Sequence, residues 1–260
     1  MFTAIIQARM GSTRLPKKTM MSIREKPLLF YTIKQAFAST KISKIIIATT
    51  TLPEDQKIVD FAKSLDLEYY CGEPLDVLDR FYQCAKKYSI NTIIRVTPDD
   101  PFVDPCIIDD VIEKFESDNF DYVSNSISKK GNVWNHDLNG FPYGLAVEVF
   151  RFTALEQAWK NSTKPSEREH VSPYMINNPK FFKLGSIKNS QDFSDIRLTV
   201  DHKEDFELAQ KIINHFQPDE IFRMEKIVKY IRDNPELQKI NSKHSFNEGY
   251  KKSLKEDEFC

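Results

Sequence analysis

Short β-branched runs alternate with longer amphipathic segments over the first 117 residues, and this alternation constrains the fold most strongly. The runs AIIQAR, KIIIATT, LEYYC and TIIRVT are followed by the segments PLLFYTIKQAFAST, EDQKIVDFAKSLD, DVLDRFYQCAKKY and CIIDDVIEKFES. Alternation of this kind is typical of βαβ units around a mostly parallel sheet. The sequence therefore predicts an α/β fold in which the strand ends face ligand-binding loops.

The pattern changes after about residue 120. Residues 124–143 are polar and rich in Asn and Ser, so we expect a long excursion from the sheet that serves as a lid or an interface. Beyond it we expect a strand at LAVEVF, a helix at FTALEQAWKNS, strands at KFFKLGSIK and IRLTVD, and a helix at KEDFELAQKIINHF. The tail after Asn234 has few apolar residues and is expected to be partly disordered.

Composition excludes several classes of protein. The 260 residues suit one elaborated domain, and 37 basic against 38 acidic residues argue against nucleic acid or an anionic membrane as partner. The opening MFTAIIQARM is too short for a signal peptide and no run spans a bilayer, so we expect a cytoplasmic protein. The four cysteines lack CxxC spacing, which argues against a disulfide framework and a zinc site.

The most informative stretch is QARMGSTRLPKK, residues 7–18, between the first predicted strand and a helical segment. Gly11 allows close approach of the backbone to an anion, and Ser12 and Thr13 offer hydroxyls and amides. GxxxxGK[ST] and GxGxxG are both absent, so the loop is neither a Walker A motif nor a dinucleotide fingerprint. A solvated basic surface turn is the alternative to a triphosphate site. The three cations that favour the triphosphate are Arg9, Arg14 and Lys18.

This loop resembles the signature of the cytidylyltransferases related to CMP-KDO synthetase and acylneuraminate cytidylyltransferase, especially those of spore-coat polysaccharide biosynthesis. The resemblance extends in order over about four fifths of the chain. It continues through DVLDR (76–80), RVTPDDPFVDP (95–105), GLAVEVF (144–150), PSEREHVSPY (165–174) and RLTVDHKEDF (197–206). Ordered motifs of this number are more specific than any one of them.

The resemblance implies a three-layer α/β/α nucleotidyltransferase fold, Rossmann-like and GT-A-like, with a mostly parallel mixed sheet and an inserted excursion. Residues 1–234 would form this domain, with 124–195 as its acceptor-binding and dimerisation part and 235–260 as a C-terminal tail. It also implies CTP and a small acidic acceptor as substrates, Mg²⁺ as cofactor, and a homodimer.

For the nucleotide, the resemblance implies phosphate contacts from the first loop and a further contact from Arg80. The alternative for Arg80 is a surface ion pair with Asp79 at a helix start. Lys18 would offset the charge that develops on the departing pyrophosphate, and Arg9 and Arg14 would assist it as catalytic residues. The expected nucleotide-binding residues are Ala8, Arg9, Gly11, Ser12, Arg14, Lys18, Arg80 and Asp99.

Two acids stand beyond predicted strands, Asp99 after IIRVT and Asp201 after LTV, so both carboxylates are expected at one end of the sheet. Mg²⁺ prefers such hard oxygen ligands together with substrate phosphates. The resemblance makes this pair the metal ligands, whereas the alternative is that either acid caps the following helix. Asp100 and Asp104 are nearby competitors, and we expect a structural role for Asp104.

The acceptor side is expected at SEREH, residues 166–170, where two acids, an arginine and a histidine crowd together. Glu169 or His170 would help to deprotonate an attacking hydroxyl, or the segment forms a network that merely pins it to the sheet. The reaction would be an in-line attack on the α-phosphorus, driven by positioning and charge neutralisation. The expected acceptor-binding residues are Gly144, Glu148, Glu169, His170 and Arg197.

Three positions depart from the resembled pattern. Lys17 and Pro98 replace glycines near the nucleotide, and Ala146 replaces an acid near the acceptor. Two other functions therefore stay open beside nucleotide transfer. One is an NDP-sugar-dependent glycosyltransferase, although a DxD motif is missing, and the other is a non-catalytic nucleotide-binding paralogue.

Overall fold

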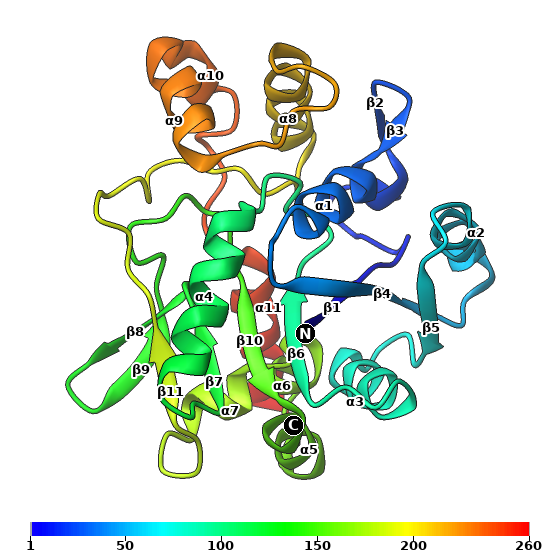
Figure 1. Ribbon diagram of the computed structural model, residues 1–260, viewed down its shortest axis with the longest axis vertical. Coiled ribbons are helices and arrows are strands. Elements are labelled where there is room, and N and C mark those ends of the chain that lie inside the picture. Colours follow the sequence, from blue (N-terminus) through cyan, green and yellow to red (C-terminus); the bar gives the residue numbers. More distant parts are fainter. Residues whose placement is uncertain (1, 260) are drawn as a thin grey trace.

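A seven-stranded sheet organises the protein, whose computed structural model describes residues 2–259 (Figure 1). Met1 and Cys260, the ends of the predicted ranges, lie outside the described residues. The strand order is β11-β7-β10-β6-β1-β4-β5, and only β10 runs antiparallel to its neighbours among these strands. The predicted mostly parallel mixed sheet is confirmed. The strands are β1 (Phe2–Gln7), β4 (Ile42–Thr50), β5 (Glu68–Gly72), β6 (Thr92–Val96), β7 (Tyr122–Ser124), β10 (Glu148–Arg151) and β11 (Leu184–Ser186).

Strand β1 lies at the centre because it is apolar on both faces. Ile5 and Ile6 are fully buried although they point to opposite sides of the sheet. Ile6 stands opposite Ile47 of β4 and Val96 of β6, both in parallel register. Strands covered on both faces are continuous apolar runs rather than alternating ones, as the sequence of β1 shows.

Helices cover both faces of this sheet and complete the predicted three layers. One apolar core lies under α1, α2, α4, α8 and α9, and the other lies under α3, α5 and α7. The helices are α1 (Leu28–Phe37), α2 (Gln56–Ser64), α3 (Val77–Lys87), α4 (Pro105–Ser117), α5 (Phe152–Asn161), α6 (Pro165–His170), α7 (Pro173–Asn177), α8 (Lys203–His215), α9 (Met224–Asp233), α10 (Pro235–Lys239) and α11 (Glu248–Glu256), with 3-10 turns η1 (Lys18–Met20), η2 (Pro53–Asp55) and η3 (Asp257–Phe259). None of the helices within residues 2–259 has the length and apolar character needed to cross a membrane.

Capping residues fix where the helices beside the site begin. The Asp76 carboxylate accepts a 2.8 Å hydrogen bond from the backbone N–H of Asp79 and so caps α3. Asp104 caps α4 by accepting from the Cys106 N–H at 2.8 Å, and Pro105 occupies the first helical position.

The polar excursion folds as two separate features. A hairpin of β8 (Ile127–Lys130) and β9 (Val133–His136) projects from the sheet, and a loop returns to β10. A small hairpin of β2 (Ser22–Ile23) and β3 (Lys26–Pro27) likewise separates the first loop from α1.

The prediction of a last strand at IRLTVD is wrong. Residues 196–201 run extended beside Tyr143, but the contact is an isolated bridge between Tyr143 and Arg197. Gly144 explains why the ladder stops there, because its φ of +105° turns the chain and a Cβ atom on it would lie 2.3 Å from the Thr199 nitrogen.

The expected partial disorder of the tail is also wrong, because residues 235–259 form α10, α11 and η3. Helix α11 lies beside α6 (Figure 1), and polar contacts connect α11 and η3 to it. The buried Ser253 hydroxyl donates to Glu169 Oε2 at 2.5 Å, and Asp257 accepts from the Ser166 hydroxyl at 2.6 Å. A composition-based argument counts apolar residues and cannot detect such contacts.

Candidate active site

The site lies where the strand order reverses. In the sheet, β4 and β5 lie on one side of β1, whereas β6, β10 and β7 lie on its other side. The loops that follow β1 and β6 therefore diverge at the carboxyl ends of adjacent parallel strands, the usual ligand position in open α/β sheets. A pocket of about 490 Å³ opens there.

The structure brings most of the predicted site residues to this pocket. Gly11 and Arg197 are the exceptions among the predicted residues, because neither is part of the lining that residues 2–259 provide. The predicted residues that line the pocket are Ala8, Arg9, Ser12, Arg14, Lys18, Arg80, Asp99, Gly144, Glu148, Glu169, His170 and Asp201.

The first loop is folded around the backbone of Met10. The Met10 carbonyl accepts hydrogen bonds from the N–H groups of Ser12 at 2.9 Å and Lys17 at 3.1 Å. The Met10 N–H in turn donates to the buried Asp55 carboxylate at 2.6 Å, and this carboxylate also accepts from the Thr50 hydroxyl at the end of β4. The loop is thus pinned to a neighbouring strand, and its cations are held at the pocket.

The three departures from the resembled pattern have different structural consequences. Lys17 has a φ of +63°, a left-handed conformation that glycine adopts freely and that costs a lysine about 1 kcal/mol. Pro98 and Ala146 both line the pocket. The loop therefore keeps the backbone shape that a glycine would favour, at some cost in strain.

Lys18 joins the two predicted metal ligands. Its ammonium group donates to Asp99 Oδ2 at 2.7 Å and to Asp201 Oδ1 at 2.8 Å, and it also donates to the Val200 carbonyl at 2.8 Å. Burial alone would lower the pKa of Lys18, but the two carboxylates outweigh it and raise the pKa above its usual value. Lys18 therefore stays charged at neutral pH and acts as a cation rather than as a base.

Asp201 is surrounded by three cations. Besides Lys18, its carboxylate accepts from Arg14 at 2.6 Å and from Arg197 at 3.4 Å. Burial would raise the pKa of Asp201, but Lys18 and Arg14 hold it well below its usual range. The alternative that Asp201 caps α8 is wrong, because His202 occupies the N-cap position and Asp205, in the first turn, closes a capping box by accepting from the His202 N–H.

The two competing acids of the β6 loop have separate surroundings. Burial and the nearby Asp99 raise the pKa of Asp100 to about 7, and its carboxyl group accepts from the Thr97 hydroxyl. Asp104 accepts from the Met224 N–H at 2.6 Å as well as capping α4, so it anchors α9 to the domain.

Arg80 is buried and lines the pocket. Its Nη2 atom donates to the carbonyls of Glu73 at 2.8 Å and Pro74 at 3.0 Å. Burial and the neighbouring charge of Arg9 lower its pKa to about 10. The alternative of a surface ion pair with Asp79 is wrong, because Asp79 accepts instead from the Trp159 indole N–H at 2.8 Å.

Arg95 is a pocket residue that the sequence analysis did not single out. It lies on β6 and pairs across the sheet with Glu148 of β10 at 2.5 Å, and both side chains are nearly buried. The Glu148 carboxylate also accepts from the hydroxyls of Tyr122 at 2.7 Å and Ser172 at 2.6 Å. A lone arginine within the apolar run TIIRVT was the available signal, because a buried cation needs an acidic partner.

Glu148 is therefore engaged by protein partners. Burial would raise its pKa, but Arg95 and the two hydroxyls outweigh burial and hold the pKa below its usual value. An ionised carboxylate with three protein donors is an anchor for Arg95. This geometry favours a positioning role over the direct acceptor contact predicted from the sequence.

Arg197 is likewise committed within the protein. Its Nε and Nη2 atoms donate to Asp205 at 2.8 and 2.9 Å, and its guanidinium lies 5.2 Å from the centre of the Tyr143 ring. The predicted pairing of Arg197 with an acceptor is not supported by this geometry. The residue supports Asp201 from behind the pocket instead.

Two residues of α6 face the pocket together with the tail. Glu169 lies 3.7 Å from Arg9 and accepts from Ser253, while His170 Nε2 lies 3.1 Å from the Ser253 hydroxyl. Burial lowers the pKa of His170 to about 4, so its imidazole is neutral at physiological pH. The pinning network that was the alternative is thus present, and both side chains still reach the pocket.

The far wall of the pocket comes from the hairpin and the tail. His136 of β9 and His170 both contact the Tyr250 ring of α11 edge-on, and Asn247 lies beside them in the lining. The Nε2 atom of His136 is buried and has no hydrogen-bond partner within residues 2–259. Sequence reasoning missed these residues because the excursion and the tail carry no regular periodicity.

Comparison with known proteins identifies the chain. A family model described as cytidylyltransferase matches residues 3–232. The chain belongs to the cytidylyltransferase family. The predicted resemblance is thereby confirmed.

Relatives of this cytidylyltransferase match it over most of their own length. An uncharacterized protein of Methanocaldococcus jannaschii is 37% identical over 92% of this chain and 93% of its own length. The spore coat polysaccharide biosynthesis protein SpsF of Bacillus subtilis is 31% identical over 78% of this chain and 82% of its own. The solved structure of a cytidylyltransferase from Leptospira borgpetersenii superposes with a TM-score of 0.82 at 28% identity, covering 91% of this chain and 95% of that one.

Proposed function

We propose that this cytidylyltransferase transfers CMP from CTP to an acidic, sugar-like acceptor and releases pyrophosphate in a Mg²⁺-dependent reaction. The similarity to SpsF, named for spore coat polysaccharide biosynthesis, supports a role in surface polysaccharide or glycoconjugate synthesis. The bridge from Lys18 to Asp99 and Asp201, set beside a basic loop at the switch point of the sheet, is the observation that carries the proposal.

The donor set suits a hard cation. Oxygens of Asp99 and Asp201 both contact one ammonium group, so they lie close enough to share a small cation, and both are carboxylates. Asp99 and Asp201 would hold Mg²⁺, which would neutralise phosphate charge during the transfer.

The chain's own residues would position and neutralise the triphosphate. Arg9, Arg14 and Lys18 supply three cations from one pinned loop, and Lys18 keeps its proton because of its two carboxylate partners. Such fixed charges stabilise a transferring phosphoryl group without covalent catalysis. On the opposite wall, Glu169 or His170 would accept the proton of the attacking hydroxyl, because both line the pocket.

The acceptor side offers groups that recognise an acid. Arg95 uses Nε and Nη1 for Gln7 and Glu148, and the residue lines the pocket. The buried His136 Nε2 lacks a partner among the described residues, and an unpaired buried polar atom costs about 1–3 kcal/mol. An acceptor carboxylate would accept a hydrogen bond from Arg95, and an acceptor hydroxyl would pair with His136 Nε2. Membership of the cytidylyltransferase family favours this reaction over the glycosyltransferase alternative.

Nucleotide preference is tested first by thermal unfolding with CTP, UTP, GTP or ATP, with and without Mg²⁺. Ligands that bind the native state raise the midpoint without requiring the acceptor. We expect the largest shift with CTP and Mg²⁺. A larger shift with another triphosphate would contradict the choice of CTP.

Catalysis is tested by pyrophosphate release with a panel of sugar acids, phosphorylated polyols and uncharged sugars. We expect turnover only with acidic acceptors, and a loss on the order of 10²–10³-fold in kcat for Lys18→Ala. Lys17→Ala is the matched control, because it removes a cation from the same loop but outside the pocket lining. CTP binding without pyrophosphate release from any acceptor would instead support the non-catalytic paralogue.

We also propose a homodimer, formed through the excursion. The hairpin of β8 and β9 projects from the sheet and exposes Val133, an apolar residue at its tip. Light scattering should give twice the chain mass, and Val133→Lys should lower it. A monomeric wild-type protein at micromolar concentration would contradict this part of the proposal.

A further inference from the structure

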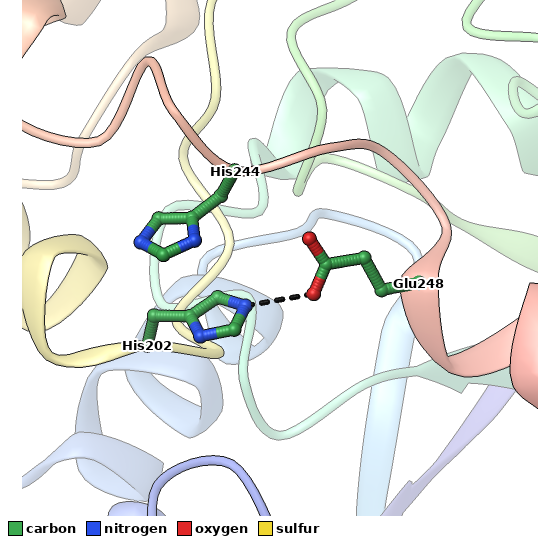
Figure 2. Close-up of side chains that lie close together, drawn as sticks. All are labelled: His202, His244 and Glu248. Carbon is green, nitrogen blue, oxygen red and sulfur yellow. Dashed lines mark hydrogen bonds and ion pairs between the residues drawn. The ribbon is translucent and has the colours of Figure 1, made fainter.

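Three potential metal ligands gather behind the pocket, outside the carboxylate pair described above. His202 precedes α8, His244 lies in the tail, and Glu248 begins α11. In the part of the chain that the structure describes, one ligand atom from each lies within 4.8 Å of the other two. Figure 2 shows the two imidazole rings one above the other, with a nitrogen of each on the side of the Glu248 carboxylate.

The hydrogen bonds around His244 fix which nitrogen is free. Its Nε2 atom lies 3.0 Å from the Glu204 carboxylate, which also accepts a 2.6 Å hydrogen bond from the Lys243 ammonium group. A carboxylate oxygen accepts hydrogen bonds, so this contact places the proton on Nε2 and leaves the lone pair of the other ring nitrogen for a metal. A histidine held in this way by a carboxylate is the arrangement found at protein-bound metals.

We propose that His202, His244 and Glu248 bind a divalent transition metal of the zinc class. Two imidazole nitrogens and one carboxylate suit Zn²⁺, whereas Mg²⁺ and Ca²⁺ prefer oxygen ligands alone. The three protein ligands leave a fourth position for water. The cysteine spacing argued against a zinc site, but this cluster contains no cysteine.

Binding requires only small movements of the three side chains. Ligands about 2.0–2.2 Å from a tetrahedral Zn²⁺ lie about 3.3–3.5 Å apart. His202 Nε2 and Glu248 Oε2 are 2.8 Å apart, so this pair would open slightly as the metal replaces their hydrogen bond. The rings stack at 3.8 Å with an angle of 1°, so they must also turn to aim at one point, and this torsion is soft in histidine.

The surrounding charges are compatible with a cation. Glu204 and Glu248 supply two negative charges, while Lys243 faces Glu204 and the charge of Glu248 acts on Arg14. The cluster therefore contains two imidazoles between two carboxylates.

The location gives the metal a defined effect on the fold. His244 and Glu248 lie beyond residue 232, where the family match ends, so the family does not imply this site. The metal would join the start of α8 to the start of α11, and α11 carries Tyr250 into the pocket wall. The metal would therefore hold the tail in place over the proposed acceptor side.

The test uses the full chain without a histidine tag, stripped with a chelator and free of nucleotide. Titration with ZnCl₂ by calorimetry should show one ion per chain, and the unfolding midpoint should rise by about 5–10 °C at a hundredfold excess over Kd. His244→Gln should lower the affinity at least 100-fold. Glu204→Gln should lower it about 10–100-fold, because the supporting carboxylate orients the ligand.

Two control variants separate this site from others. His215→Ala removes a histidine that stacks on Tyr230 away from the cluster, and Asp99→Asn removes a carboxylate of the proposed Mg²⁺ site. Both should bind Zn²⁺ as the wild type does, and Zn²⁺ should slow tryptic cleavage of the tail in both. Unsaturable binding in the wild type, or unchanged affinity in His244→Gln, would overturn the proposal. These measurements contain no CTP, so their failure is distinct from failure of the proposed function.

Discussion

Replacing Glu148 tests whether this residue positions Arg95 or contacts the acceptor. Glu148→Ala leaves the Arg95 guanidinium and the Tyr122 and Ser172 hydroxyls without their shared partner. Removing one member of a buried ion pair costs about 3–5 kcal/mol, because the remaining charge stays buried without compensation. For a chain of this size, the loss corresponds to a fall of about 6–20 °C in the unfolding midpoint.

The assay is thermal unfolding of Glu148→Ala, Glu148→Gln and Glu116→Ala at pH 7.5. Glu148→Gln keeps an acceptor oxygen, so its unfolding free energy should fall by less, about 1–3 kcal/mol. Glu116 is half exposed and lies 3.5 Å from Lys41, so Glu116→Ala should change stability by less than about 0.5 kcal/mol. A midpoint within about 2 °C of wild type for Glu148→Ala, with only the acceptor KM raised, would refute the positioning role.

The pH dependence gives an independent check on the same pair. The folded-state pKa of Glu148 lies below its usual value, so ionised Glu148 stabilises the native state fully above the unfolded pKa of about 4.3. This contribution is lost as the pH falls through the folded pKa. The difference in unfolding free energy between wild type and Glu148→Gln should therefore narrow below pH 4.3.

Three further outcomes follow from the backbone and from one histidine. Lys17→Gly should raise the unfolding free energy by about 0.5 kcal/mol in denaturant titration, because the strain removed at the positive φ exceeds the entropy cost of glycine. A lower unfolding free energy would contradict the backbone strain assigned to Lys17. Gly144→Ala should lower the unfolding free energy by about 2–4 kcal/mol, since its Cβ would meet the Thr199 nitrogen. Gly131→Ala should lower it by only about 1 kcal/mol because its Cβ meets open space, and equal losses in the two variants would contradict the close approach of Gly144 to Thr199. The pKa of His170 is about 4 in the folded chain against about 6.5 in the unfolded chain, so the unfolded chain binds a proton first as the pH falls. The unfolding free energy should therefore fall by up to about 3 kcal/mol between pH 6.5 and pH 4. His170→Asn should reduce this pH dependence, and an unchanged pH dependence would contradict the lowered pKa of His170.

The sequence predicted the part of the fold in which local pattern and tertiary burial agree. From β1 to α4 each apolar run became a strand and each amphipathic segment a helix, because the parallel strands are covered on both faces. The segment IRLTVD has the same local pattern but did not become a strand. Its outcome depends on Gly144, more than 50 residues away, which no local window includes.

The sequence predicted some of the site residues but not their partners. Motif order placed Lys18, Asp99 and Asp201 together, and the structure brings all three into contact. The partners of Glu148 were not predictable, because cross-strand register brings Arg95 opposite it. The tail wall was missed because α11 is held by hydroxyl and carboxylate contacts that composition does not reveal.

The sheet also has a seam between two stretches of chain. Strands β1, β4, β5 and β6 come from residues 2–96, while β7, β10 and β11 come from residues 122–186, and the two sets meet only where β6 pairs with β10. On the proposed function, the first stretch supplies most of the nucleotide side and the second supplies much of the acceptor side. Such an arrangement makes the protein evolvable, because substitutions or loop insertions in residues 122–186 can change the acceptor while the triphosphate loop and its neighbouring strands stay intact.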